Sequence, residues 1–365
     1  MGLKKGSPDI LIFFAVMILL AVGIIMVFSA SYYDTLDKDP YYYLRKQLFW
    51  ALLGIVTMVF MMRINYFRLK PYINTAFAVT LVLLVLVLTP QFGVEVKGST
   101  RWLDLGFTRL QPSEIMKLCL ILYFAKNLTR KGSDITSLIS GLGPYLLLIG
   151  LVGLLIMKEP DMGTLLAILA PTMILLFAAG IRWRHIALLG FSGLLALVAL
   201  IVQEPYRLNR IVGYLDPWAH ASKEGYQTIN SLYALGSGGL FGMGLGNSRQ
   251  KLDFLPEQHT DFIFAILGEE LGFIGAFFVI LLFAVIAWRG YRIALTCPDS
   301  FGSMVALGIT SSIVCQAFIN IGVVTGLLPV TGISLPFISY GGSSLLFSMI
   351  SIGVLLNVSR FSHSP

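Results

Sequence analysis

Charged residues, cysteine and histidine are all scarce in this chain, and each scarcity excludes a class of protein. Of the 365 residues only 12% are charged and 56% are hydrophobic, whereas soluble domains carry about 25% charged residues. The three cysteines (Cys119, Cys297 and Cys315) lie too far apart along the chain for a CxxC metal pair or a disulfide framework. The four histidines form no HExxH pattern, so we expect no protein-ligated zinc site. The composition therefore indicates a protein built for a lipid environment.

Apolar segments of membrane-spanning length recur along the whole chain. A helix needs about 20 apolar residues to cross roughly 30 Å of hydrocarbon. We predict ten such helices, at 10–30, 48–63, 73–90, 113–127, 138–157, 164–181, 184–203, 261–287, 303–327 and 337–358. The first follows Lys4 and Lys5, as a signal peptide would, but its apolar core is longer and further spans follow, so we expect it to be retained. The sequence therefore predicts an all-α polytopic membrane protein with a single integral membrane domain, 1–365, and a long loop at about 204–260 between the seventh and eighth helices.

The segments on one side of the membrane are rich in lysine and arginine and poor in acidic residues. If both termini are cytoplasmic, the cytoplasmic segments hold half of the 26 lysines and arginines but only three of the 19 acidic residues, Asp9, Asp134 and Asp299. This asymmetry is the positive-inside pattern of membrane proteins. It also accounts for the net charge of +7 without a nucleic-acid partner. We therefore expect both termini in the cytoplasm and the loop at 204–260 outside.

Two short outer segments carry charged side chains beside helix ends. In RWLDLGFTRLQPSEIMK (101–117), Glu114 and Lys117 are three residues apart on one helix face, where they can form an ion pair. In KEPDMGT (158–164), Asp161 can cap the helix that follows. Each feature can be a structural helix end or part of a polar cavity, and the residues alone leave both interpretations open.

The long outer loop adds further cations and flexible backbone. Arg207 and Arg210 lie one helical turn apart on an amphipathic stretch that we expect at the membrane interface. The glycine-rich sequence GSGGLFGMGLGN (236–247) follows, but no βαβ unit surrounds it, which argues against a dinucleotide site. We expect these glycines to let the backbone bend tightly near a ligand or the membrane surface.

The eighth predicted helix begins with the polar sequence LPEQHTDF (255–262), which contains Asp261. Two more acids, Glu269 and Glu270, follow in the same helix, roughly 12–14 Å deeper at 1.5 Å per residue. We expect them to be structural or gating groups that are paired within the bundle. The last outer segment, TGLLPVTGISLPFISYGGSS (325–344), has irregular backbone, which at membrane depth must be buried in protein or line a wet cavity.

We expect these outer segments to converge on one cavity. Their arginines and lysines suit an anion, above all a phosphate. A carboxylate at a helix start in a low-dielectric mouth, such as that of Asp261, can act there as a proton acceptor.

Five stretches of the sequence, in order, resemble the SEDS family (shape, elongation, division and sporulation), the peptidoglycan polymerases that include RodA, FtsW and SpoVE. They are RWLDLGFTRLQPSEIMKL, EPDMGT, YRLNRIVGYLDPW, GSGGLFGMGLGNSRQKLDFLPEQHTDFIFAILGEELGFIG and LPFISYGGSS. The resemblance covers nearly the whole chain. The stretch NIGVVTGLLPVTGISLPFISYGGSS is most like the SpoVE and FtsW-like branch of spore-forming bacteria.

The resemblance implies an inverting glycosyltransferase that polymerises lipid II into β-1,4 glycan strands on the outer face of the bacterial cytoplasmic membrane, in cell division or spore cortex synthesis. Asp261, the aspartate of the HTDF motif, would be the catalytic general base, and undecaprenyl diphosphate would be the leaving group. Nearby cations would stabilise the diphosphate, with Mg²⁺ or Mn²⁺ as a candidate cofactor and no organic cofactor. The set of substrate-binding residues that we infer is Lys46, Arg101, Trp102, Arg109, Glu114, Lys117, Asp161, Arg207, Arg210, Glu257, His259 and Ser343.

The resemblance also implies partners, namely a class B penicillin-binding protein (a transpeptidase), lipid II, nascent lipid-linked glycan and membrane lipid. Two alternative functions remain: a lipid II flippase and a non-catalytic scaffold for a transpeptidase. A flippase needs polar groups that face each leaflet in turn, whereas the charged clusters favour the outer mouth, and no inverted repeat is evident. A scaffold has no need of HTDF at the start of a helix.

Overall fold

The computed structural model describes residues 6–36, 39–96, 98–104, 106, 108–131, 135, 137–202, 205–252 and 254–362. Its helices are α1 (Ile10–Ser31), α2 (Tyr42–Arg63), α3 (Ile73–Val87), α4 (Pro112–Lys131), α5 (Gly143–Lys158), α6 (Met162–Ala178), α7 (Trp183–Val202), α8 (Pro205–Leu215), α9 (Tyr226–Gly238), α10 (Ile263–Thr296), α11 (Ser300–Val324) and α12 (Gly342–Ser359). Each of the ten predicted helices overlaps one of these, and α8 and α9 are further helices within the long loop. In the described part, seven helical segments are long and apolar enough to cross a membrane, and α6 is a shorter apolar helix. The predicted fold class is confirmed.

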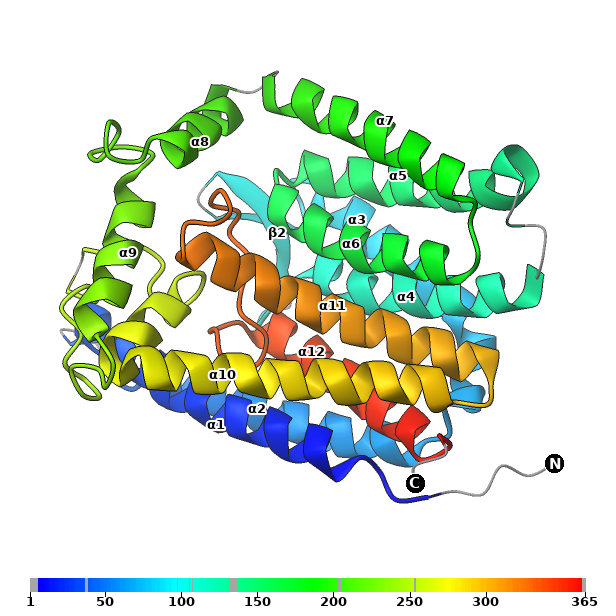
Figure 1. Cartoon of the computed structure of the whole chain (residues 1–365), viewed down its shortest axis with the longest axis horizontal. Coiled ribbons are helices and arrows are strands. Elements are labelled where there is room, and N and C mark those ends of the chain that lie inside the picture. The colour runs from blue at the N-terminus through cyan, green and yellow to red at the C-terminus, as the bar shows by residue number, and fades with distance from the viewer. Residues whose placement is uncertain are drawn as a thin grey trace.

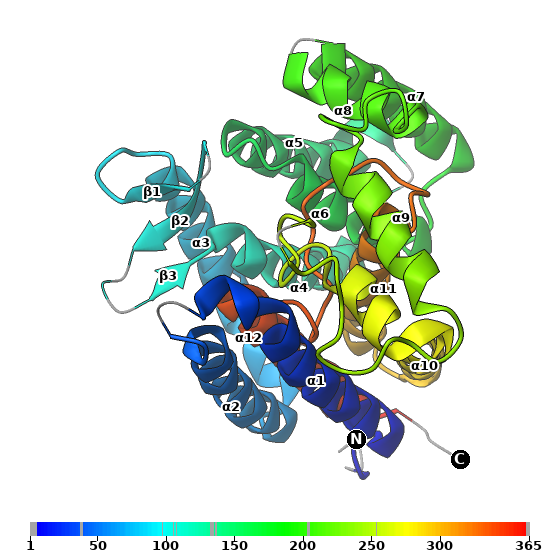
Figure 2. The same ribbon diagram turned by 90° about the vertical axis from the view of Figure 1, so that its left-hand side faces the viewer.

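The two ends of the helical bundle differ in kind. At one end the described chain begins and finishes, and the N–H of Gly6 donates to the carbonyl of Arg360 at 2.7 Å. At the opposite end, which we call the loop end, lie α8, α9 and the loop between α9 and α10 (Figure 1). Figure 2 looks onto the loop end and shows β-strands on one side and α8 and α9 on the other.

A small antiparallel sheet lies between α3 and α4, in a segment predicted only as an outer loop. It has three strands in the order β1 (Gly93–Val96), β2 (Ser99–Asp104) and β3 (Arg109–Leu110). The alternation in VEV and STRWL and the glycine at position 98, whose φ is 75°, are the local signals of such a hairpin. Short polar strands of this kind can sit on a membrane surface because their edges face water.

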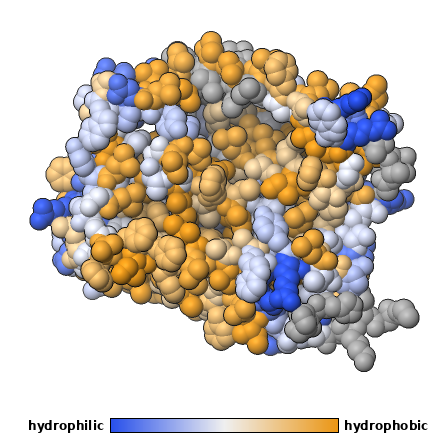
Figure 3. Space-filling model, viewed as in Figure 1, coloured by the Kyte–Doolittle hydropathy of each residue, from blue (hydrophilic) through white to orange (hydrophobic). Residues whose placement is uncertain are grey.

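Large apolar side chains cover the sides of the bundle between its two ends (Figure 3). Leu52 and Phe60 of α2 are 64% and 61% exposed, Phe191 of α7 is 63% exposed and Phe273 of α10 is 62% exposed. In water such a belt would drive association, whereas lipid chains cover it without cost. The surface therefore fits a bundle that spans a bilayer.

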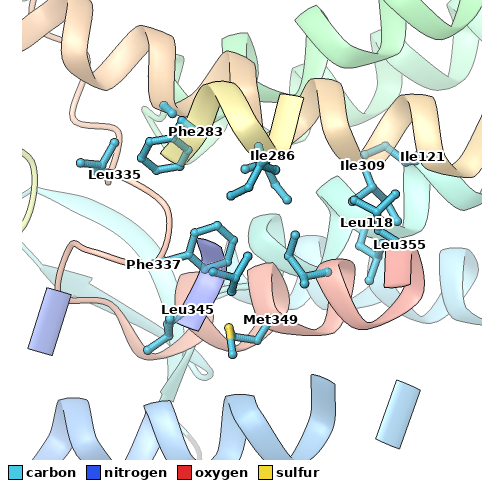
Figure 4. Close-up of a cluster of buried hydrophobic side chains, with 14 of the residues drawn as sticks. Leu118, Ile121, Phe283, Ile286, Ile309, Leu335, Phe337, Leu345, Met349 and Leu355 are labelled. Atoms are coloured by element: carbon cyan, nitrogen blue, oxygen red, sulfur yellow. The ribbon is translucent and has the colours of Figure 1, made fainter. Parts of the chain in front are cut away.

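The centre of the bundle is packed with apolar side chains from four helices. Leu118 of α4, Ile286 of α10, Ile309 of α11 and Leu355 of α12 are all buried there (Figure 4). Because lipid is as apolar as these side chains, the helices are held together mainly by close van der Waals packing.

A non-helical segment, residues 325–341, connects α11 to α12 and packs against the first two helices. We predicted that the last helix begins at 337, but it begins at Gly342, because Pro336 and the glycines after it favour other backbone conformations. A Cβ on Gly23 of α1 would lie 2.4 Å from the carbonyl oxygen of Phe337, and one on Gly342 would lie 2.4 Å from the Trp50 ring of α2. Both glycines are therefore required for the close approach.

The helix predicted at 261–287 is broken near its start. Gly272 has φ 69° and ψ −170°, so residues 263–271 form a short helix that is separate from the long one that follows. The N–H groups of Met243 and Gly244 donate to the carbonyls of Glu269 and Glu270 at 2.9 and 3.1 Å, which satisfies the end of the short helix.

Gly272→Ala should lower the stability of the protein by at least about 1–3 kcal/mol, since the residue would be held in a left-handed conformation. Its new Cβ would also lie 2.3 Å from the backbone nitrogen of Gly242. The matched control is Gly190→Ala in α7, where an added Cβ meets no described atom within 4 Å. Thermal unfolding in detergent measures both, and equal melting temperatures for the two variants would contradict the expectation.

Candidate functional site

Asp261 lies in the turn that precedes α10, with its side chain half-buried. Asn320 of α11 holds this position, because its Nδ2 donates to the carbonyl of Asp261 at 2.7 Å and to that of Ile333 at 2.6 Å. The carboxylate lies beside Gly332, where an added Cβ would be 3.4 Å from Asp261 Oδ2. The predicted general base therefore lies against the 325–341 segment.

The same turn is bonded to this segment at two further points. The carbonyl of His259 accepts from the N–H of Tyr340 at 2.9 Å. The carbonyl of Thr260 accepts from the hydroxyl of Ser339 at 2.6 Å. Turn and segment therefore hold each other in place.

Arg101 of β2 contacts the turn between α5 and α6. Its Nε donates to the carbonyl of Glu159 at 3.2 Å, its Nη2 donates to the carbonyl of Pro160 at 2.6 Å, and its Nε lies 3.7 Å from Asp161 Oδ2. Asp161 also caps α6, where it accepts from the N–H and the hydroxyl of Thr164 at 3.0 and 2.8 Å. The helix-cap interpretation of Asp161 is therefore confirmed, and Asp161 is also the buried partner of a cation, whereas its role in a polar cavity stays a prediction.

Glu114 and Lys117 form the predicted ion pair. Lys117 Nζ lies 2.7 Å from Glu114 Oε2, and both side chains are buried. Lys117 also donates to Gln316 Oε1 at 2.7 Å, and Gln316 Nε2 donates to the carbonyl of Ser334 at 2.9 Å. A cavity of about 20 Å³ beside the pair has room for a single water molecule. Through Gln316 this pair, too, is linked to the 325–341 segment.

Five consecutive residues, Val330 to Ser334, contact these groups or the residues bonded to them. Arg210 of α8 donates from Nη1 to the carbonyl of Val330 at 2.9 Å. The start of α6 lies against Thr331, since a Cβ on Gly163 would be 2.4 Å from the Thr331 carbonyl oxygen. The next three residues make the contacts given above. The fold thus gathers four of the predicted residues from four parts of the chain: Arg101, Lys117, Arg210 and Asp261.

Other predicted residues lie elsewhere at the loop end. Lys46 is exposed near the start of α2, with its Nζ 4.3 Å from the centre of the Tyr42 ring. Arg109 is exposed on β3, and Trp102 is half-buried on β2. Arg207 belongs to α8, but its side chain lies outside the described part of the chain. Their roles in substrate binding stay predictions.

Glu257, His259 and Ser343 each have a structural contact. Glu257 accepts from a threonine hydroxyl of its own turn at 3.0 Å. The His259 ring packs on Tyr43, with ring centres 4.5 Å apart. Ser343 Oγ accepts from the N–H of Gln111 at 3.1 Å at the start of α12. These contacts fix the positions of the three side chains in the fold. Their roles in substrate binding stay predictions.

Gln316 and Asn320 were not among the predicted residues, although the sequence contains a signal for them. They lie four residues apart in a largely apolar helix, so their amide side chains share one face. Polar groups inside a membrane helix face the bundle interior or a wet cavity. The sequence therefore indicates a polar face on α11. The hydrogen-bond partners of that face depend on the tertiary structure.

Glu159 is a further residue that was not predicted. Its side chain is completely buried, and within the described residues neither carboxylate oxygen has a hydrogen-bond partner. Burial, reinforced by the nearby charge of Asp161 and opposed by Arg101, raises the pKa of Glu159 from 4.5 to about 8. At neutral pH this turn therefore contains an uncharged carboxylic acid beside an ion pair.

Glu269 and Glu270 anchor the loop that follows α9. Glu269 accepts from the N–H groups of Arg249 and Gln250 at 3.0 and 3.3 Å. Glu270 Oε1 lies 2.9 Å from Lys251 Nζ, and both of these side chains are buried. Both carboxylates are thus paired, as expected.

The expectation that these acids lie deeper than Asp261 is wrong. Glu270 accepts from the hydroxyl of Ser29 at 2.7 Å, and α1 ends at Ser31. Because Gly272 breaks α10, the short helix before it lies at the loop end beside α9 (Figure 1). The acids therefore stabilise the loop end rather than the middle of the bundle.

A metal site built by the protein alone is not found in the described part of the chain, where no three metal-ligating side chains cluster. The carboxylates suggested as ligands, Glu114 and Asp161, are bonded to Lys117 and to Thr164 and Arg101. Mg²⁺ commonly takes one or two carboxylates together with phosphate oxygens of a substrate. Binding of Mg²⁺ or Mn²⁺ by these two carboxylates stays a prediction.

Buried ionic groups at one end of an apolar helical bundle define the class of protein: a polytopic membrane protein with a charged site near one face of the bilayer. The sequence model of the family described as "Cell cycle protein" (FtsW, RodA and SpoVE) matches residues 9–364. The chain therefore belongs to the FtsW/RodA/SpoVE family, and it is a peptidoglycan glycosyltransferase.

Two curated relatives cover almost the whole chain. Stage V sporulation protein E of Bacillus subtilis (strain 168) is 49% identical over 99% of this chain and 100% of its own length. The probable peptidoglycan glycosyltransferase FtsW of Geobacter sp. (strain M18) is 42% identical over 96% of both chains. The family resemblance read from the five sequence stretches is confirmed.

Solved structures share the fold. A chain from a peptidoglycan synthase complex that coordinates polymerization and crosslinking superimposes with a TM-score of 0.81 at 30% identity, covering 97% of this chain and 98% of that one. The rod shape determining protein RodA of Thermus thermophilus superimposes with a TM-score of 0.73 at 29% identity, covering 98% and 99%.

The stability of Glu159→Gln relative to the parent protein should increase as the pH rises, because the stability of the parent falls. Because the pKa of Glu159 is raised from 4.5 to about 8, the folded protein keeps a proton that the unfolded chain releases in this window. The stability of the parent should therefore fall as the pH rises from about 4.5 to about 8, by at most about 1.4 kcal/mol per pH unit. Melting temperatures across this range should diverge for Glu159→Gln and not for the control Glu95→Gln, an exposed acid on β1. A constant difference would contradict the assigned environment.

Glu270→Gln should destabilise the protein by about 3–5 kcal/mol, because it leaves the buried charge of Lys251 without its partner. The double variant Lys251→Met with Glu270→Gln should recover most of this loss, since an apolar side chain can replace a buried ion. The melting temperatures of both single variants and the double variant form a double-mutant cycle. Strictly additive effects would show that the two groups are not coupled.

Proposed function

We propose that this chain polymerises lipid II into β-1,4-linked glycan on the outer face of the cytoplasmic membrane, with Asp261 as the general base. The observation that supports this most directly is that the half-buried Asp261 carboxylate, Arg210 and, through Gln316, Lys117 all adjoin the five residues Val330–Ser334. Transfer of a sugar from a lipid diphosphate needs both kinds of group in one place.

In the proposed reaction, Asp261 takes the proton from the 4-hydroxyl of the acceptor N-acetylglucosamine. The oxygen attacks C1 of the donor N-acetylmuramic acid as the bond to the diphosphate breaks, so the α-linked donor becomes a β-linked product. Undecaprenyl diphosphate leaves with the bonding electrons, and the cations stabilise its charge. Arg101, Lys117 and Arg210 are the candidate cations. Their hydrogen bonds to backbone or side-chain acceptors fix their positions before the substrate binds.

The proposed orientation places the loop end outside the cell. The two ends of the described chain meet at the opposite end of the bundle, which supports a common side for the termini. The lysine and arginine bias favours the cytoplasm for that side. Substrate that has crossed the membrane would then reach the site directly.

We also propose a class B penicillin-binding protein as the partner of this chain. The support is the similarity to a chain of a peptidoglycan synthase complex that couples polymerization to crosslinking. If Mg²⁺ or Mn²⁺ assists, Glu114 and Asp161 are the carboxylates that would hold it, and the ion would add positive charge at the diphosphate.

The packing favours a polymerase over a flippase. A flippase must carry a polar head group through the bundle, whereas apolar side chains such as Leu118, Ile309 and Leu355 fill the centre of the bundle (Figure 4). A scaffold would not require a carboxylate and cations arranged along one backbone segment. The assay below separates the three functions.

Asp261→Asn should lower the rate of glycan polymerisation by about 10²–10⁴-fold, the usual loss when a general base is removed. The assay follows fluorescent lipid II with the purified chain and its transpeptidase, in the presence of moenomycin to silence contaminating transglycosylases. An unchanged rate in Asp261→Asn would overturn the mechanism.

The matched control is Asp104→Asn, which changes an exposed acid of β2 at the same end of the molecule. It should polymerise at the parent rate. Asp261→Asn should also melt like the parent and still co-purify with the transpeptidase, so that lost activity reports lost chemistry rather than lost folding.

A further inference from the structure

A polar cavity of about 360 Å³ lies at the loop end, between α8 and the start of α9. Six of the polar side chains that line it are Arg210, Lys223, Glu224, Tyr226, Gln227 and Thr228. Its volume is at the low end of pockets that take small organic ligands. None of the reaction steps above uses it.

The cavity adjoins the site described above. Arg210 and Val330 line it, and they are joined by the 2.9 Å hydrogen bond from the guanidinium to the carbonyl. Val330 is two residues from Gly332, which lies against the Asp261 carboxylate, and two residues of extended chain span about 7 Å. Pro256, at the start of the stretch that carries Asp261, also lines the cavity. A ligand in the cavity would therefore lie next to the reacting groups.

Close contacts between its walls fix the shape of the cavity. A Cβ on Gly213 of α8 would lie 2.6 Å from the Cβ of Glu224, and one on Gly225 would lie 2.1 Å from the carbonyl oxygen of Pro217. The hydroxyl of Tyr214 donates to the carbonyl of Leu327 at 2.9 Å. Close glycine contacts and this hydrogen bond fix α8 against the start of α9 and the 325–341 segment.

The lining offers donors and acceptors that the protein itself does not use. Among the described residues, no hydrogen bond or ion pair involves the side chains of Lys223, Glu224 or Gln227. Together they present a cation, an anion and an amide. Sugar hydroxyl and acetamido groups both donate and accept, so they can satisfy all three. A diphosphate offers acceptors only, so it could not form a hydrogen bond with the carboxylate of Glu224.

The cavity also has aromatic side chains, which suit a sugar ring. Tyr214 and Tyr226 both line the cavity, and a tyrosine combines an apolar ring with a polar hydroxyl. A pyranose ring likewise combines apolar C–H faces with polar edges.

We propose that this cavity is a saccharide subsite that holds an N-acetyl sugar of the glycan strand, one or more units away from the sugar that reacts. The proposal rests on the proposed function and adds a place where the strand is held between successive additions. The ligand is the uncharged saccharide, and the lipid-linked diphosphate lies on the Asp261 side of Arg210.

The first test measures binding to the purified full chain in lipid nanodiscs, with a tetramer of N-acetylglucosamine as the probe and saturation-transfer NMR as the readout. The parent should bind the tetramer, and Glu224→Gln and Gln227→Ala should each weaken binding at least about fivefold. The matched control Glu95→Gln, an exposed acid on β1, should bind like the parent. Inorganic diphosphate should not displace the tetramer. Equal binding by all variants, or displacement by diphosphate, would overturn the proposal.

The second test measures glycan strand length after polymerisation of lipid II. If the strand is released early when the cavity is altered, Glu224→Gln and Gln227→Ala should make strands at least about twofold shorter than the parent and the Glu95→Gln control. Strands of parental length would count against the subsite. The two proposals fail differently: without polymerase activity the parent makes no strand, whereas without the subsite every variant makes strands of parental length.

Discussion

A stretch of backbone without regular structure, placed inside a membrane bundle, must have its polar groups satisfied by protein. The 325–341 segment meets this requirement with side chains from distant helices: Arg210, Asn320 and Gln316 each donate to one of its carbonyls. These donors also connect the groups of the proposed chemistry. Arg210 is itself one of the cations, Asn320 also bonds the carbonyl of Asp261, and Gln316 also accepts from Lys117. The irregular backbone is thus the part of the fold around which the site is arranged.

The buried ionic groups of the bundle follow the rules of a low-dielectric environment. Lys117 and Lys251 are buried with a carboxylate at 2.7 and 2.9 Å, which compensates for the loss of water. Glu159, which has no such partner among the described residues, is instead neutral at neutral pH, as its raised pKa indicates. A buried charge is therefore either paired or removed by protonation. Cations held in this way need little reorganisation when negative charge develops on a leaving group.

The position of the saccharide cavity gives the proposed polymerase a spatial order. Arg210 lines the cavity, and its partner Val330 is two residues from Gly332, which lies against Asp261, so a glycan strand in the cavity would lie next to the general base. The short helix at 263–271 follows the turn that carries Asp261, and Glu269 and Glu270 near its end anchor the loop after α9. Chemistry and strand holding would then share one rigid loop end, while the apolar helices beneath serve as the membrane anchor.

The sequence by itself determined the ten helices, the family and the acid of the HTDF motif, because long apolar runs and local motifs depend only on neighbouring residues. It did not determine the break at Gly272, which follows from contacts with Gly242 in the loop after α9. Nor did it show that Lys117 reaches the 325–341 segment through Gln316, 199 residues away. Such contacts depend on which helices pack together, and apolar helices in lipid can pack in many ways until close van der Waals fit selects one. Only the tertiary structure therefore decided which of the charged residues lie along the same segment as Asp261.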